Sequence, residues 1–238
     1  MISTAVILAA GLGTRFGKQT ESKPKGFIPF KGIPMVERSV QMLIMCGIKK
    51  IIIGTGYLKE WYEALEKEYP GMVQCVFSRR YAETNSMYTL WNCREAIGEN
   101  DFLLFESDLV FEKKAVTELI NCAFDSAMLI TPVTKFQDQY YVQMNEKSEL
   151  INCSINKEEI APSGELVGIH KISNEFYKLL CSEYEKKINE KPKLGYEFQL
   201  LDVSQRIKPM HVLKLEDLQW YEIDDVHDLQ YAEENILI

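Results

Sequence analysis

The sequence VILAAGLGTRFG at residues 6–17, followed by KPKGF at residues 23–27, is the stretch from which the fold of this chain can be inferred. Its first residues form a short apolar run that predicts a buried strand. Three glycines follow, and glycine lets a backbone approach a ligand closely and offer N–H groups to phosphate oxygens. Arg15, Lys23 and Lys25 add the positive charge that a polyphosphate requires. We therefore expect a nucleoside triphosphate site at the start of the chain.

The glycine spacing departs from the two most familiar nucleotide-binding loops. A dinucleotide-binding fingerprint, G-x-G-x-x-G, would need glycine where Phe16 stands, and the glycine comes one place later. A Walker A loop has four residues between its first glycine and its G-K pair, whereas five separate Gly11 from Gly17. These spacings argue against a Rossmann dehydrogenase and a P-loop ATPase. A plain glycine-rich turn between a strand and a helix stays open as the alternative.

The bulk composition fits a single domain that binds neither nucleic acid nor membrane. With 238 residues, of which 46% are apolar, the chain can bury a sizeable core. Its formal net charge of −8 argues against a nucleic-acid partner, so an anionic ligand needs a local cationic pocket. The six cysteines include no C-x-x-C pair and predict neither zinc nor a small disulfide framework. The apolar runs are too short for a signal peptide or a membrane span, and we expect a cytoplasmic protein.

The hydrophobic periodicity predicts an α/β fold. Helical spacing over residues 34–44 and 58–69 alternates with strand patterns over 50–54 and 72–77. This order predicts a Rossmann-like sheet, mixed but mainly parallel, flanked by helices. Further strand and helix patterns follow in the second half, where we expect a small insertion that covers the ligand edge of the sheet. They lie at residues 127–133, 140–144, 150–155, 166–172, 173–187 and 196–201, with a last helix that runs to Ile236.

Two acidic segments are candidates for a metal site. An apolar strand pattern runs into Glu106 and Asp108, which lie two residues apart and so share a face. Mg²⁺ prefers oxygen ligands and takes one or two carboxylates besides phosphate. Asp108 is therefore a candidate ligand, with a cap of the helix that begins near Glu112 as its structural alternative. Near the end lie Asp224 and Asp225. If this segment is considered without the rest of the sequence, one of the two is interpreted as the cap of the last helix.

The pattern L-A-A-G-x-G-T-R followed by P-K resembles the signature of nucleotidyltransferases that join a nucleoside monophosphate to a sugar phosphate or a small alcohol phosphate. The resemblance implies the nucleotidyltransferase fold, with Arg15 and Lys25 as the catalytic cations on the phosphates. It also implies that Asp108 and Asp224 hold Mg²⁺, and that Asn85 and Ser86 contact cytosine. The positions assigned to nucleotide binding are Leu8, Ala9, Ala10, Gly11, Leu12, Gly13, Thr14, Asn85 and Ser86. For the last two, a plain helix N-cap is the structural alternative.

The whole chain is similar, more narrowly, to cytidylyltransferases that activate phosphocholine or 2-aminoethylphosphonate. The blocks PKGF at 24–27, IGTGY at 53–57, LFESDL at 104–109 and GELVGI at 164–169 are most similar to the 2-aminoethylphosphonate enzymes. One departure is TNSM at 84–87, where those enzymes carry T-G-S-M and the phosphocholine enzymes often have asparagine. The resemblance implies transfer of CMP from CTP to 2-aminoethylphosphonate with release of pyrophosphate, and phosphocholine is the alternative acceptor.

The acceptor's far end is expected to be an amine or a quaternary ammonium, which aromatic faces and carboxylates can bind. Our candidates for this contact are Tyr88, Glu106, Glu165, Glu197 and Trp220. The chain 1–238 is then a single nucleotidyltransferase domain. Its parts are a nucleotide-binding core over about 1–133, an acceptor-binding part over about 134–215, and a segment over about 216–238 with the second metal carboxylate and the last helix.

A nucleotide-sensing domain that binds CTP without turnover is the alternative from another functional class. The presence of Arg15, Lys25, Asp108 and Asp224 favours the enzyme. The expected partners are CTP, Mg²⁺ and a small zwitterionic phosphonate or phosphate ester. A homodimer is the one protein assembly that we consider.

Overall fold

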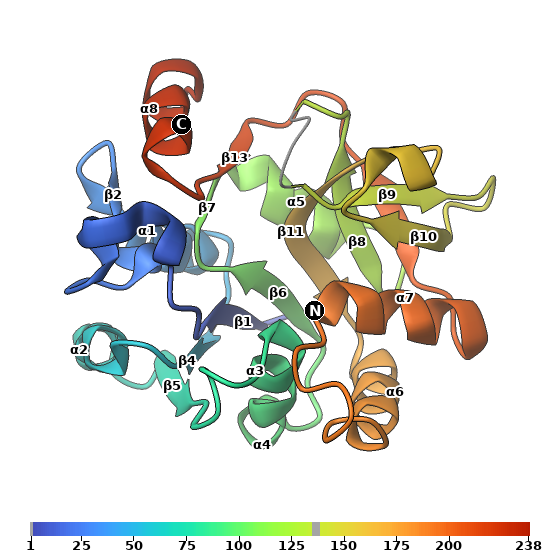
Figure 1. The fold of residues 1–238 in the computed structure, drawn as a ribbon, viewed down its shortest axis with the longest axis horizontal. Coiled ribbons are helices and arrows are strands. Elements are labelled where there is room, and N and C mark those ends of the chain that lie inside the picture. The colour runs from blue at the N-terminus through green and yellow to red at the C-terminus, as the bar shows by residue number, and fades with distance from the viewer. Residues whose placement is uncertain (1, 135–138) are drawn as a thin grey trace.

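The computed structural model describes residues 2–134 and 139–238, and its central feature is a mixed β-sheet (Figure 1). Among the described residues, nine strands belong to it, in the order β10-β9-β11-β6-β1-β4-β5, with β8 beside β11 and β12 beside β8. These strands are β1 Thr4–Ala9, β4 Lys50–Thr55, β5 Val73–Phe77, β6 Phe102–Glu106, β8 Ala127–Thr131, β9 Tyr141–Met144, β10 Leu150–Ser154, β11 Gly164–Ile172 and β12 His211–Lys214. Two short pairs lie outside it, namely β2 Pro29–Phe30 with β3 Ile33–Pro34, and β7 Leu109–Phe111 with β13 Trp220–Glu222.

Helices cover both faces of this sheet. The α-helices are α1 Met35–Met45, α2 Lys59–Glu68, α3 Ser86–Asn92, α4 Arg94–Ile97, α5 Lys113–Asn121, α6 Asn174–Glu185, α7 Tyr196–Arg206 and α8 Val226–Asn235. Three short 3₁₀ segments are η1 Thr14–Thr20, η2 Lys25–Phe27 and η3 Lys157–Glu159. Within the described ranges, none of these helices has both the length and the apolar character needed to cross a bilayer.

The N-terminal half confirms the predicted alternation of strands and helices. β1 pairs in parallel with β4 and β6, and β4 pairs in parallel with β5. The helix predicted over 34–44 is α1, which begins one residue after Pro34, and the helix predicted over 58–69 is α2. The Rossmann-like, mainly parallel sheet flanked by helices is therefore confirmed.

The second half extends the same sheet with antiparallel strands. β11 pairs antiparallel with β6, β8 and β9, so the chain reverses its direction across the sheet at this point. The predicted strands over 140–144, 150–155 and 166–172 correspond to β9, β10 and β11. β7, β12 and β13 were not predicted, because three or four residues are too few for an alternating pattern to be recognised.

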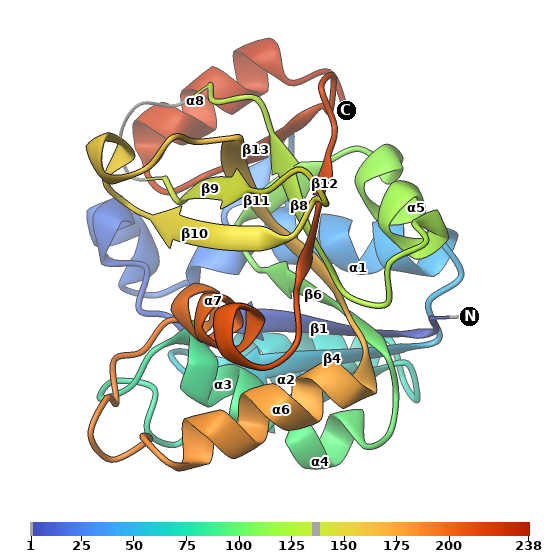
Figure 2. The ribbon, with the colours of Figure 1, turned by 90° about the vertical axis from the view of Figure 1, so that its right-hand side faces the viewer.

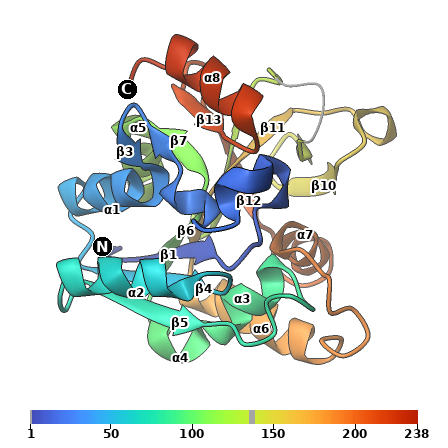
Figure 3. The same ribbon diagram turned by 60° about the vertical axis from the view of Figure 1, so that its left-hand side comes forward.

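The two faces of β1 supply two separate cores. Val6 and Leu8 point to one face and pack in a cluster with residues of α3, α6 and α7 (Figure 2). Ala5 and Ile7 point to the other face, into a cluster with residues of α1, α2 and α5 (Figure 3). Burying one large aliphatic side chain stabilises the fold by about 1.5–3 kcal/mol, so this two-sided strand anchors the sheet. It also fixes the position of the glycine-rich loop that follows it.

The contact between α3 and β4 provides a test of this packing. A Cβ atom at Gly54 would lie 2.5 Å from Thr89 Cγ2 and 3.2 Å from Cys93 Sγ. We expect Gly54→Ala to lower the free energy of unfolding in urea by about 1–3 kcal/mol, because α3 must move away. Thr89→Ser removes the contacting methyl group and should recover part of that loss in the double variant. An equal effect of Thr89→Ser in both backgrounds would contradict the close approach.

Candidate active site

The strand ends at the carboxyl edge of the sheet surround a cavity of about 470 Å³. Parallel pairing places Leu8 of β1 directly beside Glu106 of β6, so both strands end at this edge. This is the edge at which open α/β sheets bind ligands. All seven predicted nucleotide-loop positions, residues 8–14, line the cavity. The predicted loop is therefore in place to contact a ligand there.

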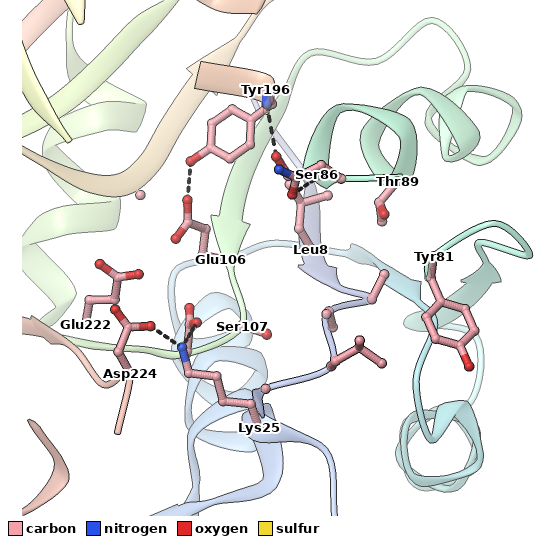
Figure 4. A pocket seen from close by; sticks show the side chains of 18 of the residues that line it. Leu8, Lys25, Tyr81, Ser86, Thr89, Glu106, Ser107, Tyr196, Glu222 and Asp224 are labelled. Carbon is pink, nitrogen blue, oxygen red and sulfur yellow. Dashed lines mark hydrogen bonds and ion pairs between the residues drawn. The ribbon is translucent and has the colours of Figure 1, made fainter. Parts of the chain in front are cut away.

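Lys25 is the central cation of the cavity. Its ammonium group donates to Asp108 Oδ2 and to Asp224 Oδ1, each over 2.5 Å (Figure 4). Arg15 Nη2 lies 2.6 Å from the same oxygen of Asp224. Burial works against the charge of Lys25, but the carboxylates of Asp108, Asp224 and Glu222 raise its pKa above the ordinary value. Lys25 therefore remains a cation throughout the neutral pH range.

A backbone contact explains how Asp108 and Asp224 meet although they are far apart in the sequence. β7 and β13 pair antiparallel, and the amide of Ile223 donates to the carbonyl oxygen of Asp108 over 3.0 Å.

The structure also shows which of Asp224 and Asp225 is the cap of the last helix. Asp225 Oδ1 accepts from the amides of His227 and Asp228 at the start of α8. Asp224 is therefore left to face the cavity.

The carboxylates beside Lys25 have the composition of a cation site. Oxygen atoms of Glu106, Asp108 and Glu222 lie within 4.8 Å of one another. Asp108 Oδ1 is buried and has no hydrogen-bond partner within the described part of the chain. Hard divalent cations prefer such oxygen donors. Glu222 was missed in the sequence, although it lies two residues from Asp224 and so shares its side of the extended segment.

Beyond Lys25, the cavity has an acidic end formed by Glu106, Glu197 and Glu222, which we call the acidic chamber. The hydroxyl of Tyr196 points to Glu106 and donates to its Oε1 over 2.5 Å (Figure 4). Burial raises the pKa of Glu106 well above its usual value, and the charges of Glu222, Asp108 and Glu197 raise it further. Burial also raises the pKa of Glu197 to about 7. A cationic ligand would relieve this accumulation of negative charge.

Asn85 and Ser86 line the cavity and also hold its wall together. Asn85 is the N-cap of α3, and its Oδ1 accepts from the amide of Ser86 over 2.8 Å. Ser86 Oγ accepts from the amide of Tyr196 over 3.0 Å, which ties α3 to the start of α7. The predicted helix cap is confirmed at Asn85, and the predicted contact of Asn85 and Ser86 with cytosine stays a prediction, for which both residues lie in the cavity lining.

Three of the predicted acceptor-binding residues do not line the cavity. Glu165 is fully buried, and its carboxylate accepts from the amide and hydroxyl groups of Thr134. The indole N–H of Trp220 donates to Thr131 Oγ1 over 3.1 Å, beneath the sheet's ligand edge. Tyr88 packs against Trp91 in the α3 core. Each of these side chains has a contact within the protein, and the structure does not bring the three to the cavity.

The remaining predicted residues Glu106 and Glu197 do line the cavity. Gln139 and Lys193 line it as well and were missed in the sequence. Gln139 Nε2 donates to Glu222 Oε2 over 3.3 Å, and Lys193 donates to the carbonyl oxygen of Ala82. Both come from irregular segments, where periodicity gives no signal.

A family model and several known proteins are similar to this chain. A family model described as the MobA-like NTP transferase domain matches residues 5–171. The 2-aminoethylphosphonate cytidylyltransferase of Lancefieldella rimae is 33% identical over 114 residues, which are 48% of this chain and 46% of that protein. The choline-phosphate cytidylyltransferase of Streptococcus pneumoniae is 29% identical over 240 residues, 97% of this chain and 96% of the relative.

A solved structure shares the fold over nearly the whole chain. The CTP:phosphocholine cytidylyltransferase from Streptococcus pneumoniae superposes with a TM-score of 0.81 at 24% sequence identity. The match covers 98% of this chain and 99% of the other. The nucleotidyltransferase fold is therefore confirmed independently of the sequence motifs.

The raised pKa of Glu197 predicts a pH-dependent stability. Because the folded state holds this proton up to about pH 7, the free energy of unfolding falls as the pH rises from about 4.5 to 7. We expect Glu197→Gln, which cannot ionise, to be more stable than the parent at pH 8 by about 1–3 kcal/mol. The difference should shrink below pH 4.5 in urea unfolding. Glu68→Gln, on the exposed end of α2, is the control, and a constant difference for Glu197→Gln would contradict the burial of an ionisable carboxyl.

Proposed function

This chain belongs to the MobA-like NTP transferase family, and we propose that it transfers CMP from CTP to a small amino-phosphonate. The acceptor that we favour is 2-aminoethylphosphonate, which would give CMP-2-aminoethylphosphonate and pyrophosphate. Relatives described as 2-aminoethylphosphonate and choline-phosphate cytidylyltransferases support the nucleotide and the class of acceptor. The observation that carries the proposal is the division of one cavity into a cationic loop and an adjoining acidic chamber.

The reaction we infer is an in-line attack of a phosphonate oxygen on the α-phosphorus of CTP. The new P–O bond forms as the bond to the bridging oxygen of the pyrophosphate breaks, and pyrophosphate leaves. The acceptor oxygen is already an anion, so the protein need not supply a strong base, and positioning and charge carry most of the catalysis. Lys25 would neutralise the α-phosphate and the acceptor, and Arg15 the leaving pyrophosphate.

Asp108 fits the role of a Mg²⁺ ligand best, because its Oδ1 is buried without a partner in residues 2–134 and 139–238. Glu222 supplies a neighbouring oxygen, and Glu106 is assigned instead to the ammonium end of the acceptor. Asp224 Oδ1 is engaged by Lys25 and Arg15, and it becomes available as a second carboxylate when phosphate oxygens take over those two cations. A bound Mg²⁺ would supply further neutralisation of the phosphate charge.

The acidic chamber favours a primary ammonium over a quaternary one. A primary ammonium has three N–H donors, and Glu197 Oε2 is a buried acceptor that lacks a partner among the described residues. A quaternary ammonium has no donor and would leave this oxygen unsatisfied. The chamber also adjoins Lys25 through Asp108, so the anionic and cationic ends of the acceptor must be close together. A two-carbon amino-phosphonate meets this requirement.

Phosphocholine is the second candidate, and one observation favours it. Tyr140 and Tyr196 line the cavity at the acidic chamber, and tyrosine faces attract quaternary ammonium groups. A CTP sensor without turnover is disfavoured, because Arg15, Lys25 and Asp108 all meet in the cavity.

Removing the central charges tests the site. We expect Lys25→Ala and Asp108→Ala each to lower kcat by about 10²–10³, because a preorganised charge on the reacting phosphates is lost. Release of pyrophosphate from CTP and 2-aminoethylphosphonate with Mg²⁺ is the measurement. Lys178→Ala removes a surface lysine that pairs with Glu99 and serves as the control. Near-parental turnover of either cavity variant, in a folded protein, would refute the assignment.

An acceptor panel tests the specificity. We expect kcat/KM for 2-aminoethylphosphonate to exceed that for phosphocholine by about tenfold or more, since the carboxylates lose hydrogen bonds with a quaternary ammonium. Phosphoethanolamine, which keeps the primary ammonium, should fall between the two. A preference for phosphocholine would make it the acceptor in place of 2-aminoethylphosphonate. If no acceptor leads to release of pyrophosphate but CTP binds tightly, the nucleotide-sensing domain would be favoured.

A further inference from the structure

A chain of hydrogen bonds leads from the acidic chamber into the core. Tyr196, at the start of α7, donates its hydroxyl proton to Glu106 Oε1 over 2.5 Å. The oxygen of the same hydroxyl lies 3.0 Å from Nε2 of His170, which comes from β11. His170 is fully buried and is not among the described residues that line the cavity. Its hydrogen bond to Tyr196 connects it to the cavity lining.

The hydrogen-bond donors in this series point in one direction, from His170 through Tyr196 to Glu106. A phenol hydroxyl has a single proton, and in this structure Tyr196 gives it to Glu106. The phenol oxygen is then available as an acceptor toward the ring, which favours the tautomer of His170 that is protonated at Nε2. Nδ1 has no partner within the described ranges, and an unpaired acceptor is less costly there than an unpaired N–H. Burial lowers the pKa of His170 to about 3, which keeps the ring neutral.

The same strand confines the other side of the Glu106 carboxylate. Gly168 has a φ of +78°, and the register of β11 against β8 shifts between Leu166 and His170. A Cβ atom at Gly168 would lie 3.1 Å from Glu106 Cδ and 3.2 Å from its Oε2. Glycine is therefore needed both for the backbone conformation and for the space. β11 therefore leaves room for Glu106 Oε2 at Gly168 and supplies His170, which hydrogen-bonds the tyrosine that donates to Oε1.

We propose that His170 is a positioning residue that, through Tyr196, fixes the Glu106 carboxylate for an acceptor carrying an N–H-bearing ammonium group. The inference rests on the proposed function, in which the acidic chamber receives the ammonium end of the acceptor. The His170 N–H donates to the phenol oxygen, so the phenol O–H stays directed at Glu106 Oε1. Glu106 then keeps one orientation, with its remaining acceptor capacity on the side of the cavity.

The experiment compares two changes at His170 with one at Tyr196. His170→Leu removes the donor, whereas His170→Gln places an amide N–H near the former Nε2. Tyr196→Phe removes the hydroxyl and keeps the ring. We expect Tyr196→Phe to raise KM for 2-aminoethylphosphonate about tenfold and His170→Leu to raise it about threefold to tenfold. KM for CTP should stay unchanged, and His170→Gln should restore most of the acceptor affinity.

Two controls separate positioning from a general loss of structure. n-Propylphosphonate has a methyl group in place of the ammonium, and its kcat/KM should be the same in all variants and the parent. Tyr184→Phe removes another fully buried hydroxyl, which has no partner in the described part of the chain, and should leave both acceptors unaffected. Equal losses with both phosphonates, a raised KM for CTP, or no rescue by His170→Gln would each overturn the inference.

The tautomer of His170 gives a readout that does not depend on the variants' stability. Nitrogen NMR of the ¹⁵N-histidine-labelled parent should show that the ring of His170 is neutral and protonated at Nε2. The resonances of His170 are assigned as those that are absent from the spectrum of His170→Gln. If that variant does not fold, they are assigned as those that shift in Tyr196→Phe. Protonation at Nδ1 would overturn the inference even if His170→Leu does not fold. Lack of turnover by the parent with every acceptor would instead refute the proposed function, so the two failures are distinguishable.

Discussion

The ion pairs of Lys25 with Asp108 and Asp224 are the interaction on which the arrangement of the cavity depends. They join residues 83 and 199 positions apart and so tie the start of the chain, the end of β6 and the segment after β13 to one point. Taking three charged groups out of water is costly unless each finds a partner, and here every charge has an opposite one within hydrogen-bond distance. The cluster thus forms the cationic and anionic elements of the site before any ligand arrives.

Local patterns in the sequence were sufficient to predict the parallel half of the fold and the position of the residues close to the glycine-rich loop. Strands such as β1 and β4 are buried on both faces, and helices such as α1 and α2 keep one apolar stripe, so their periods are visible along the chain. The loop that follows β1 and Asp108 after β6 lie at the carboxyl ends of adjacent parallel strands, so their proximity follows from the strand order.

The acidic chamber could be predicted only in part, because its walls come from elements with weak local signals. Glu222 lies on a three-residue strand, and Gln139 lies in an irregular segment. Glu165 and Trp220 have the right chemistry for an acceptor site, yet their side chains are engaged by Thr134 and Thr131 and do not line the cavity. In β11 the shift in register near Gly168 changes which residues face the cavity, and an alternating pattern does not reveal it.

The neighbouring residues Asp224 and Asp225 link the site to a helix that contributes nothing to its lining among the described residues. One carboxylate faces Lys25, and the next begins α8 by accepting two of its first amides. Asp228 of α8 also accepts from the amide of Asp224 over 3.0 Å. Fraying of α8 would therefore displace a carboxylate that faces Lys25 and Arg15. The last helix thus supports the position of Asp224 mechanically. Mutations on the surface of this helix can therefore affect the activity although they lie far from the cavity.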